Sequence, residues 1–486
     1  MGEVIRAILV PNRGEIAVRI ARACREMRIR SILGHAEHDD VRFVRRFFDD
    51  AVVLRGGYLD VGSVIDAARA CDADAIHPGY GFLSERASLA AACEEAKIIF
   101  IGPSAASIEA MGSKAHSRHL MQRLGVPVVP GYDGDDQAHF AEEAERIGFP
   151  VLVKASAGGG GKGMKIVRGR DELVPQIESA RREAMKAFGD DRLLLEKYIE
   201  EPRHVEFQIF GDARGDVVHL FERDCSIQRR HQKVVEETPA PRYSDALRQR
   251  MAQAAVAAAR GVDYRNAGTV EFIVTPENDF YFLEMNTRLQ VEHPITEQVT
   301  GVDLVRAQID VASGKPLPWK ELHQRGHAIE VRVYAEDPDD RFLPQSGTIG
   351  YYAEPSGPGV RVDAGVTQGS EVGVSFDPML AKLVAYAESR DAAIDRLDRA
   401  LRDFTILGVT TNVSWLRRVV THEAFRDGRV STRFVVDHEE SLRRATPEIV
   451  PAVAAVLAAV APASTPAGPA ASRRRTVWDA LGNWGR

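Results

Sequence analysis

The sequence predicts a multidomain protein of α/β and α+β class that begins with a doubly wound parallel sheet. Three observations support this prediction. Strand and helix patterns alternate over the first hundred residues, a glycine-rich loop separates two strands near residue 160, and short strands resume beyond residue 330. A chain of 486 residues is also too long for one small core, so two or three packed domains are expected.

The first hundred residues predict a Rossmann-like region. Apolar strand patterns and helix patterns follow one another at 4–10, 16–27, 31–33, 51–54, 64–70, 75–77 and 98–101. Strands that alternate with helices form a parallel sheet, and ligands bind at the carboxyl ends of such strands. Because this fold serves many functions, the region alone does not indicate a ligand.

From about residue 111 the pattern changes to α+β. Helices are predicted at 113–124, 137–147 and 171–188, and strands at 150–154, 164–167, 193–196, 204–210, 217–222, 268–274 and 280–285. A third, mixed domain packed against the second is predicted from strands at 328–335, 347–353, 360–362 and 381–387 and a helix at 390–404. Residues 446–448 predict the start of an Ala/Val helix, and 462–471 predict an Ala/Pro/Ser linker.

The composition argues against several classes of protein. A net charge of −7 gives no reason to expect nucleic acid as the main partner. The four cysteines (Cys24, Cys71, Cys93 and Cys225) lack CxxC spacing, which argues against a cysteine zinc site and a disulfide framework. The longest apolar run, 449–461, is shorter than the ~20 residues that span a bilayer, and the N-terminus lacks a signal-peptide pattern. A cytoplasmic, soluble protein is therefore expected.

The glycine-rich loop is the first feature that indicates chemistry. Gly158, Gly159, Gly160, Gly161 and Gly163 lie between strand patterns, with Lys154 before the loop, Lys162 within it and Met164 at its end. Glycines let backbone N–H groups approach phosphate oxygens, and lysines add positive charge. The loop is not a Walker A motif, because the GK[ST] ending and the following helix are missing. A flexible hairpin turn explains the glycines about as well as phosphate binding does.

Acidic residues on later strands indicate a nucleotide and its metal. Glu196 and Lys197 end a strand that could present backbone groups to adenine and a carboxylate to ribose. Glu271 and Glu284 lie on two strand patterns joined by a predicted hairpin at 276–279, with Asn286 just beyond. Such oxygen ligands suit Mg²⁺. Paired acids are more often solvated surface charge, but both of these stand in apolar runs and are expected to be buried with a partner.

Seven sequence blocks resemble the biotin carboxylases of the ATP-grasp superfamily. They are Asn12-Arg13-Gly14-Glu15-Ile16-Ala17, residues 77–85, residues 111–114, the glycine-rich loop, residues 203–208, residues 224–233 and residues 284–293. The blocks occur in the family's order, and the resemblance runs from residue 4 to about residue 440. It implies a Rossmann-like domain at 1–112, an ATP-grasp domain at 113–327 with a mobile lid at about 131–203, a C-terminal mixed α/β domain at 328–445, and a linker and tail at 446–486.

The resemblance also implies roles for individual residues. ATP would be bound by Lys114, Lys154, the Gly158–Gly163 loop with Lys162, Met164, Glu196, Lys197, His204, Gln228 and His231. Mg²⁺ or Mn²⁺ would be bound by Glu271, Glu284 and Asn286, and bicarbonate by Lys233, Arg288, Gln290, Val291 and Glu292. Glu292 would be the general base, while Arg361 and Tyr80 would contact biotin. Taken alone, Arg361 is typical of a surface ion pair and His204 of a structural histidine.

The implied reaction is carboxylation of biotin by ATP and bicarbonate through carboxyphosphate, the first half-reaction of an acetyl- or acyl-CoA carboxylase. A pyruvate or other carboxylase remains an alternative, as do a different ATP-grasp ligase and a non-catalytic nucleotide-binding scaffold. No Ala-Met-Lys-Met biotin-attachment motif occurs. The biotin carboxyl carrier protein is therefore expected on another chain or in a region outside this sequence. The carboxyltransferase is expected on another chain, with this chain as a homodimer or part of a larger complex.

Overall fold

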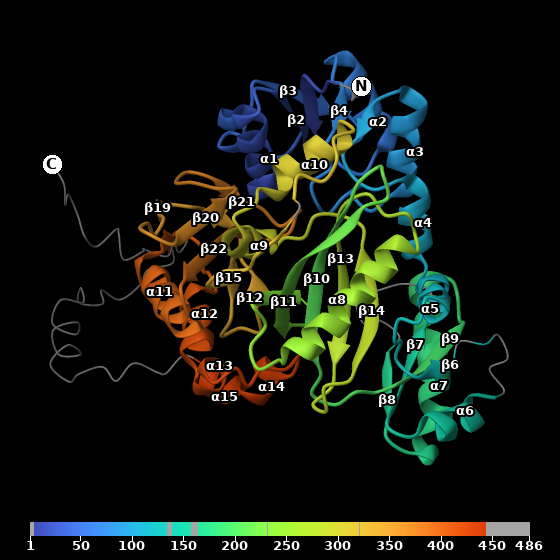
Figure 1. Cartoon of the computed structure of the whole chain (residues 1–486). Coiled ribbons are helices and arrows are strands. Elements are labelled where there is room, and N and C mark those ends of the chain that lie inside the picture. Colours follow the sequence, from blue (N-terminus) through green and yellow to red (C-terminus); the bar gives the residue numbers. More distant parts are fainter. Residues whose placement is uncertain are drawn as a thin grey trace, which may run out of the picture. The chain divides into compact units, whose positions relative to one another are not determined.

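The first hundred residues form the predicted parallel sheet (Figure 1). In the order β3-β2-β1-β4-β5, its strands are Asp50–Leu54, Arg30–Ala36, Ala7–Val10, Ala75–Ile76 and Ile99–Phe100. Along β1, Ile8 and Val10 pack in one core with helix α1 (Gly14–Glu26), whereas Ala7 and Leu9 pack in another with α2 (Val61–Ala70) and α3 (Ala87–Ala96). Successive strand residues point to opposite faces, so helices cover both faces.

The computed structural model describes residues 4–132, 134, 139–156, 164–230, 232–319 and 321–443, and only the backbone of Lys114, Ala115 and Phe188. Residues 1–443 form one unit. The helix predicted after Thr446, the linker and the C-terminal tail lie outside the described residues. None of the helices in the described part combines the length and apolar character that crossing a bilayer requires.

A four-stranded antiparallel sheet carries the glycine-rich loop. In the order β6-β9-β7-β8, its strands are Gly131–Tyr132, Leu193–Lys197, Val151–Ala155 and Lys165–Val167. Helices α6 (Phe140–Ile147) and α7 (Arg170–Phe188) share a core with this sheet. The single helix predicted over 113–124 is preceded by a second one: α4 (Ala105–Gly112) ends where the Ser113 side chain caps α5 (Lys114–Arg123).

An eight-stranded sheet forms the centre of the protein. In the order β14-β13-β10-β11-β12-β15-β22-β20, its strands are Phe280–Asn286, Asn266–Val274, Arg203–Gly211, Val217–Arg229, Gln232–Thr238, His327–Tyr334, Met379–Ala387 and Val360–Ala364. Strand β12 pairs antiparallel with β15, so the sheet continues across the predicted domain boundary near residue 327. The third region therefore extends the sheet of the second instead of only packing against it.

Strand β12 and helix α8 (Asp245–Arg260) are among the elements of this region that the sequence patterns did not predict. The Ser244 side chain caps α8, whose residues Leu247, Met251, Ala255 and Ala259 are buried. This spacing of four residues is typical of a helix that packs one face on a core. Helix α8 covers one face of the sheet through contacts with Phe207 and Phe272 in a shared core.

Helices and short strands complete the described chain. The helices are α9 (His293–Thr300), α10 (Leu304–Ala312), α11 (Arg390–Asp403), α12 (Val413–Thr421), α13 (Glu423–Arg426), α14 (Phe434–Asp437), α15 (Glu439–Leu442) and the 3-10 turn Val44–Phe47. The short strand pairs are β16 (Glu336–Asp337) with β17 (Leu343–Pro344), β18 (Gly347–Thr348) with β21 (Glu371–Val372), and β19 (Tyr351–Ala353) with β23 (Thr405–Leu407). Helices α11 and α12 share the core of β15 and β22.

Candidate active site

The two faces of the eight-stranded sheet differ in chemistry. Phe207 and Phe272 point toward α8, whereas the neighbouring Glu206 and Glu271 point to the other face. On that face the Arg223 guanidinium, which is fully buried, donates to Glu206 Oε1 at 2.5 Å, Gln208 Oε1 at 2.9 Å and Thr296 Oγ1 at 2.9 Å. A buried charge needs such partners, so this face is organised around polar chemistry.

Glu292, the predicted base, lies at the start of α9 and is fully buried. Its Oε1 accepts from Lys233 Nζ at 2.9 Å, and its Oε2 accepts from the Arg332 guanidinium at 3.0 Å. Burial raises the pKa of Glu292, but Lys233, Arg332 and Arg223 outweigh burial and hold this pKa well below its usual range. The carboxylate is therefore ionised and able to accept a proton.

Lys233 joins three carboxylates. Its ammonium lies 2.5 Å from Glu206 Oε2, 2.8 Å from Glu271 Oε1 and 2.9 Å from Glu292 Oε1. Burial lowers the pKa of Lys233, but the three acids outweigh burial and raise this pKa well above its usual range. Lys233 is thus a permanent cation that links the predicted metal ligand Glu271 to the predicted base.

Glu271 is surrounded by donors. Besides Lys233, its Oε1 accepts from Asn286 Nδ2 at 2.8 Å and Gln290 Nε2 at 3.1 Å, while its Oε2 pairs with His204 Nε2 at 2.7 Å. Burial raises the pKa of Glu271, but Lys233 and His204 outweigh burial and hold this pKa far below its usual range. The ionised carboxylate and the amide of Asn286 form the kind of oxygen ligand set that Mg²⁺ prefers.

Glu284 lies directly opposite Glu271 on β14, as the predicted hairpin requires. The expectation that both acids are buried is wrong for Glu284, which is exposed together with Leu283. The pairing of β13 and β14 shifts between Glu271 and Phe272, and this irregularity breaks the alternation of buried and exposed side chains. One carboxylate of the pair is therefore inside the cluster and the other faces solvent, which leaves access for a hydrated cation.

The predicted bicarbonate residues lie beside this cluster. The Arg288 guanidinium donates to Glu85 Oε2 at 2.9 Å, Gln290 Oε1 at 2.7 Å and Asn286 Oδ1 at 3.1 Å. Burial lowers the pKa of Arg288, but Glu85 and other carboxylates outweigh it and raise this pKa. Because Glu85 belongs to the N-terminal region, the contact ties that region to the site. The carbonyl of Val291 accepts from Lys382 Nζ at 2.7 Å.

The predicted ATP residues fall into two groups. Lys154 on β7 forms an ion pair with Glu196 on β9, which also contacts the Arg118 guanidinium at 3.3 Å. In the eight-stranded sheet, Gln228 Nε2 lies 2.7 Å from His204 Nδ1. Lys197 serves the fold, since its ammonium donates to the carbonyls of Gly148 and Phe149, both at 2.9 Å. The residues Gly158, Gly159, Gly160, Gly161, Lys162, Gly163 and His231 and the side chain of Lys114 lie outside the described residues, while Met164 directly precedes β8.

Arg361 lies away from the contacts of Glu292. Its guanidinium donates to Glu297 Oε2 at 2.8 Å and Asp363 Oδ2 at 2.7 Å, and it lines a hollow of about 460 Å³ with Arg19 and Arg22. The arginine that contacts Glu292 is Arg332, which the sequence reasoning missed. Arg332 lies between Val331 and Val333 on β15, a strand that is buried along its whole length. A charged residue at such a buried position indicates that it has a partner. Arg332 therefore lies beside the predicted base Glu292, whereas Arg361 contacts Glu297 and Asp363 instead.

Tyr80, the other residue predicted to contact biotin, lies near the loop 287–292 between β14 and α9. Its ring centre is 5.9 Å from Lys382 Nζ, the same ammonium that contacts Val291. The Tyr80 hydroxyl is buried and has no hydrogen-bond partner among the described residues. A buried hydroxyl without a partner costs free energy, so a ligand that hydrogen-bonds there would be stabilised.

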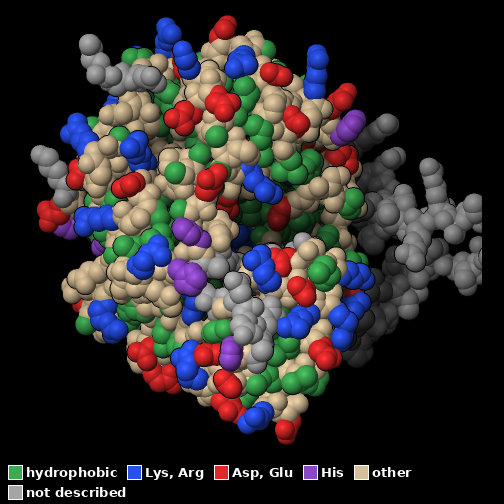
Figure 2. Space-filling model, turned by 90° about the vertical axis from the view of Figure 1, so that its right-hand side faces the viewer, with side chains coloured by type: hydrophobic (Ala, Val, Ile, Leu, Met, Phe, Trp, Pro, Cys, Tyr) green, Lys and Arg blue, Asp and Glu red, His purple; other side chains and the backbone are tan. Residues whose placement is uncertain are grey.

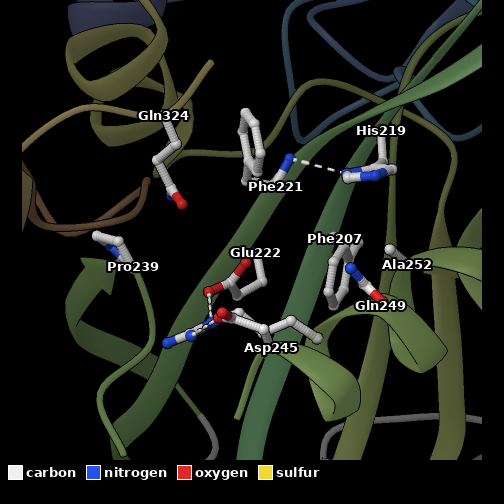
Figure 3. A pocket seen from close by; sticks show the side chains of 10 residues that line it. Phe207, His219, Phe221, Glu222, Pro239, Asp245, Gln249, Ala252 and Gln324 are labelled. Atoms are coloured by element: carbon white, nitrogen blue, oxygen red, sulfur yellow. Dashed lines mark hydrogen bonds and ion pairs between the residues drawn. The ribbon is translucent and has the colours of Figure 1, made fainter. Parts of the chain in front are cut away.

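Figure 2 shows a face on which acidic and basic side chains are interspersed, with a hollow near its middle. A separate hollow of about 360 Å³ lies on the α8 side of the sheet, and its lining includes Phe207, His219, Phe221, Pro239 and Gln324 (Figure 3). Its polar wall is Glu222, whose Oε1 accepts from the Arg248 guanidinium at 2.8 Å. This hollow contains none of the predicted site residues.

Three family models match the chain in succession. They are the biotin carboxylase N-terminal domain over residues 4–108, the ATP-binding domain of the carbamoyl-phosphate synthase L chain over 113–320, and the biotin carboxylase C-terminal domain over 330–437. Together they cover the three-domain arrangement that the sequence predicted, and they confirm the predicted fold class.

Curated relatives are similar over most of the chain. A biotin carboxylase of Halalkalibacterium halodurans is 48% identical over 90% of this chain and 98% of its own length. A pyruvate carboxylase subunit of Methanothermobacter thermautotrophicus is 48% identical over 91% of this chain and 92% of its own length. The α-subunit of the mitochondrial methylcrotonoyl-CoA carboxylase of Dictyostelium discoideum is 48% identical over 90% of this chain but 64% of its own length. The chain therefore spans less than two thirds of that longer relative.

Solved structures show the same similarity in three dimensions. The biotin carboxylase domain dimer of Hydrogenobacter thermophilus 2-oxoglutarate carboxylase, solved with MgADP, ADP and bicarbonate, has a TM-score of 0.87 at 44% identity and covers 91% of this chain and 100% of its own. The biotin carboxylase of Campylobacter jejuni, solved as a βγ-ATP complex, has a TM-score of 0.86 at 41% identity and covers 90% and 99%.

Proposed function

This chain belongs to the biotin carboxylases, a family of ATP-dependent ligases, and on that premise we propose that it carboxylates carrier-linked biotin with bicarbonate and Mg-ATP. The observation that carries the proposal is the position of Glu292. This buried, ionised carboxylate contacts Lys233 and Arg332, and through Lys233 it is joined to the proposed metal ligand Glu271.

In this proposal Glu292 removes the proton of bicarbonate. A carboxylate with a lowered pKa is a weak base in isolation. However, Lys233 and Arg288 would bind the bicarbonate itself, and nearby cations lower the pKa of the bicarbonate hydroxyl as they lower that of Glu292. The difference between the pKa of Glu292 and the pKa of bicarbonate therefore changes less than either pKa does. The deprotonated oxygen can then attack the γ-phosphate, which gives carboxyphosphate.

The chain's own residues supply the remaining functions. Lys154, Glu196, His204 and Gln228 would bind ATP, as would Lys114, the Gly158–Gly163 loop and His231. Mg²⁺, held by Glu271, Glu284 and Asn286, would neutralise charge on the phosphates. Carboxyphosphate breaks down to CO₂ and phosphate, and the phosphate would take the N–H proton of the biotin ureido group. The ureido nitrogen would then attack CO₂ to form the N–C bond, while Arg332 is placed to stabilise the negative charge on the ureido oxygen. Exclusion of water matters because carboxyphosphate hydrolyses.

The experiment is an assay of ATP hydrolysis with free biotin as acceptor. We expect hydrolysis that depends on bicarbonate and rises with biotin. Glu292→Gln should reduce turnover about 10²–10⁴-fold, with ATP binding changed by less than about twofold because none of the described ATP groups contacts Glu292. A rate that is unchanged when bicarbonate is omitted would contradict the function, and equal losses of turnover and ATP affinity would contradict the role of Glu292.

We further propose that the chain is one component of an acyl-CoA carboxylase and that it forms a dimer. Similarity to the methylcrotonoyl-CoA carboxylase α-subunit supports the acyl-CoA acceptor, and the related domain dimer supports self-association. Pyruvate is the second candidate acceptor, because the pyruvate carboxylase relative is equally similar at 48% identity. Purification of the complex from the native host, followed by assays with acetyl-CoA, propionyl-CoA, methylcrotonoyl-CoA and pyruvate, separates the two.

A further inference from the structure

Besides Lys233, a second buried lysine lies next to the loop 287–292, which carries Glu292. Lys382 on β22 is fully buried, and its ammonium donates to the carbonyl oxygen of Val291 at 2.7 Å. The same ammonium lies 3.3 Å from Glu15 Oε2 on α1 and 5.9 Å from the centre of the Tyr80 ring. Lys382 thus contacts the loop that carries Glu292 and two segments of the N-terminal region.

The strand register relates Lys382 to Arg332. The two residues are direct partners in the antiparallel pairing of β15 and β22. Arg332 contacts the side chain of Glu292 at 3.0 Å, and Lys382 contacts the carbonyl of the residue before it. Two cations from paired strand positions therefore hold two consecutive residues of one loop, one by its side chain and one by its backbone.

Neutralising Glu15 is the simpler explanation for Lys382. Glu15 is buried; its Oε2 lies 3.3 Å from the Lys382 ammonium, and its Oε1 accepts no hydrogen bond from any described residue. Burial raises the pKa of Glu15 to about 7, although Lys382 lowers it. Within the described structure, the hydrogen bond of the ammonium goes to Val291, whereas Glu15 lies at a longer distance. The geometry therefore gives Lys382 a role toward the loop that neutralisation alone does not require.

We propose that Lys382 is a positioning residue: it holds the peptide group between Val291 and Glu292 in the orientation that bicarbonate binding requires. The peptide unit is planar, so fixing the carbonyl of Val291 also fixes the direction of the Glu292 N–H. Gln290, on the other side of Val291, is fixed by its bond to Glu271. The inference rests on the proposed function, because bicarbonate is the ligand that this loop is proposed to bind.

The test compares four variants by steady-state ATP hydrolysis with free biotin, at varied bicarbonate and varied ATP. Lys382→Met should raise the KM for bicarbonate on the order of tenfold, the effect of one lost hydrogen bond to a charged group, with the KM for ATP within about twofold of the unaltered protein. Glu15→Gln keeps the bond to Val291 and should leave both constants near their original values. Lys315→Met is the matched control, because Lys315 is an exposed lysine paired with Asp310.

The double variant Glu15→Gln/Lys382→Met separates the two roles and guards against misfolding of the single Lys382 variant. Removing both charges should restore much of the Tm that Lys382→Met loses, while the KM for bicarbonate stays high because Val291 still lacks its donor. A double variant whose KM for bicarbonate returns to the original value would overturn the proposal and leave neutralisation of Glu15 as the role. Parallel increases in both KM values would overturn it too. Absence of bicarbonate-dependent hydrolysis in the unaltered protein would refute the proposed function instead.

Discussion

The predicted ATP residues lie on two sheets whose ion pairs differ in burial. In the four-stranded sheet, the ion pair of Lys154 and Glu196 keeps side-chain exposures of 17% and 16%. In the eight-stranded sheet, Lys233 contacts three carboxylates whose side chains are at most 4% exposed. A partly exposed pair is worth less than a buried one and can exchange its partner for a ligand, whereas a buried cluster must be satisfied internally. The first arrangement suits a contact that opens for ATP, and the second suits a site that is organised before substrates arrive.

The largest effect is expected for Lys233→Met. The change leaves Glu206, Glu271 and Glu292 buried without their shared cation, and breaking a buried ion pair costs about 3–5 kcal/mol. Urea unfolding measures this loss, and bicarbonate-dependent hydrolysis should disappear in the same variant. Lys165→Met is the control, since Lys165 on β8 of the four-stranded sheet and Glu183 on α7 form a more exposed pair. Equal stability losses in the two variants would contradict the difference between the sheets.

A smaller effect is expected for Glu237→Gln on β12, and it depends on pH. The Glu237 carboxylate is buried and accepts from His327 at 2.8 Å and from Arg390 at 2.7 Å. Burial raises the pKa of Glu237, but these partners outweigh burial and lower it to about 2. An acid whose pKa is lowered on folding stabilises the fold above its unfolded pKa and loses this contribution as pH falls toward the folded value.

The difference in unfolding free energy between the unaltered protein and Glu237→Gln should therefore be about 3 kcal/mol at pH 7. It should shrink below pH 4.5 and fall to roughly half by pH 3. Urea unfolding at several pH values measures this difference. A difference that stays constant from pH 7 to pH 3 would show that the contribution of Glu237 does not come from its charge.

The smallest change in stability is expected for Lys154→Met. Because the Lys154–Glu196 pair is partly exposed, its loss should cost less than about 1 kcal/mol. The KM for ATP should nevertheless rise on the order of tenfold if Lys154 contacts phosphate. Thermal unfolding and ATP-dependent rates are measured on the same preparation. A large fall in Tm with an unchanged KM for ATP would place Lys154 in the fold and not in the ATP site.

Local patterns predicted much of the fold and part of the site. Alternation of strands and helices predicted the N-terminal sheet, and the hairpin of Glu271 and Glu284 followed from two strand patterns and a turn. Helix α8 could have been predicted from its Ser244 cap and from the spacing of its apolar residues, although it stands among strands in the sequence. Arg332 and Lys382 could not be placed, because their proximity to Glu292 depends on the pairing of β12, β15 and β22 across almost 150 residues of sequence.

The continuous sheet has a practical consequence for dissecting this protein. Since β12 pairs with β15, a fragment ending near residue 327 would leave unpaired the backbone donors and acceptors of β12 that face β15. A fragment beginning at residue 328 would do the same to the edge of β15 that faces β12. Unpaired strand edges attract other strands and lead to aggregation or domain swapping. Either fragment expressed alone is therefore expected to aggregate. When the two fragments are produced together, they are expected to associate, because β12 and β15 can pair again.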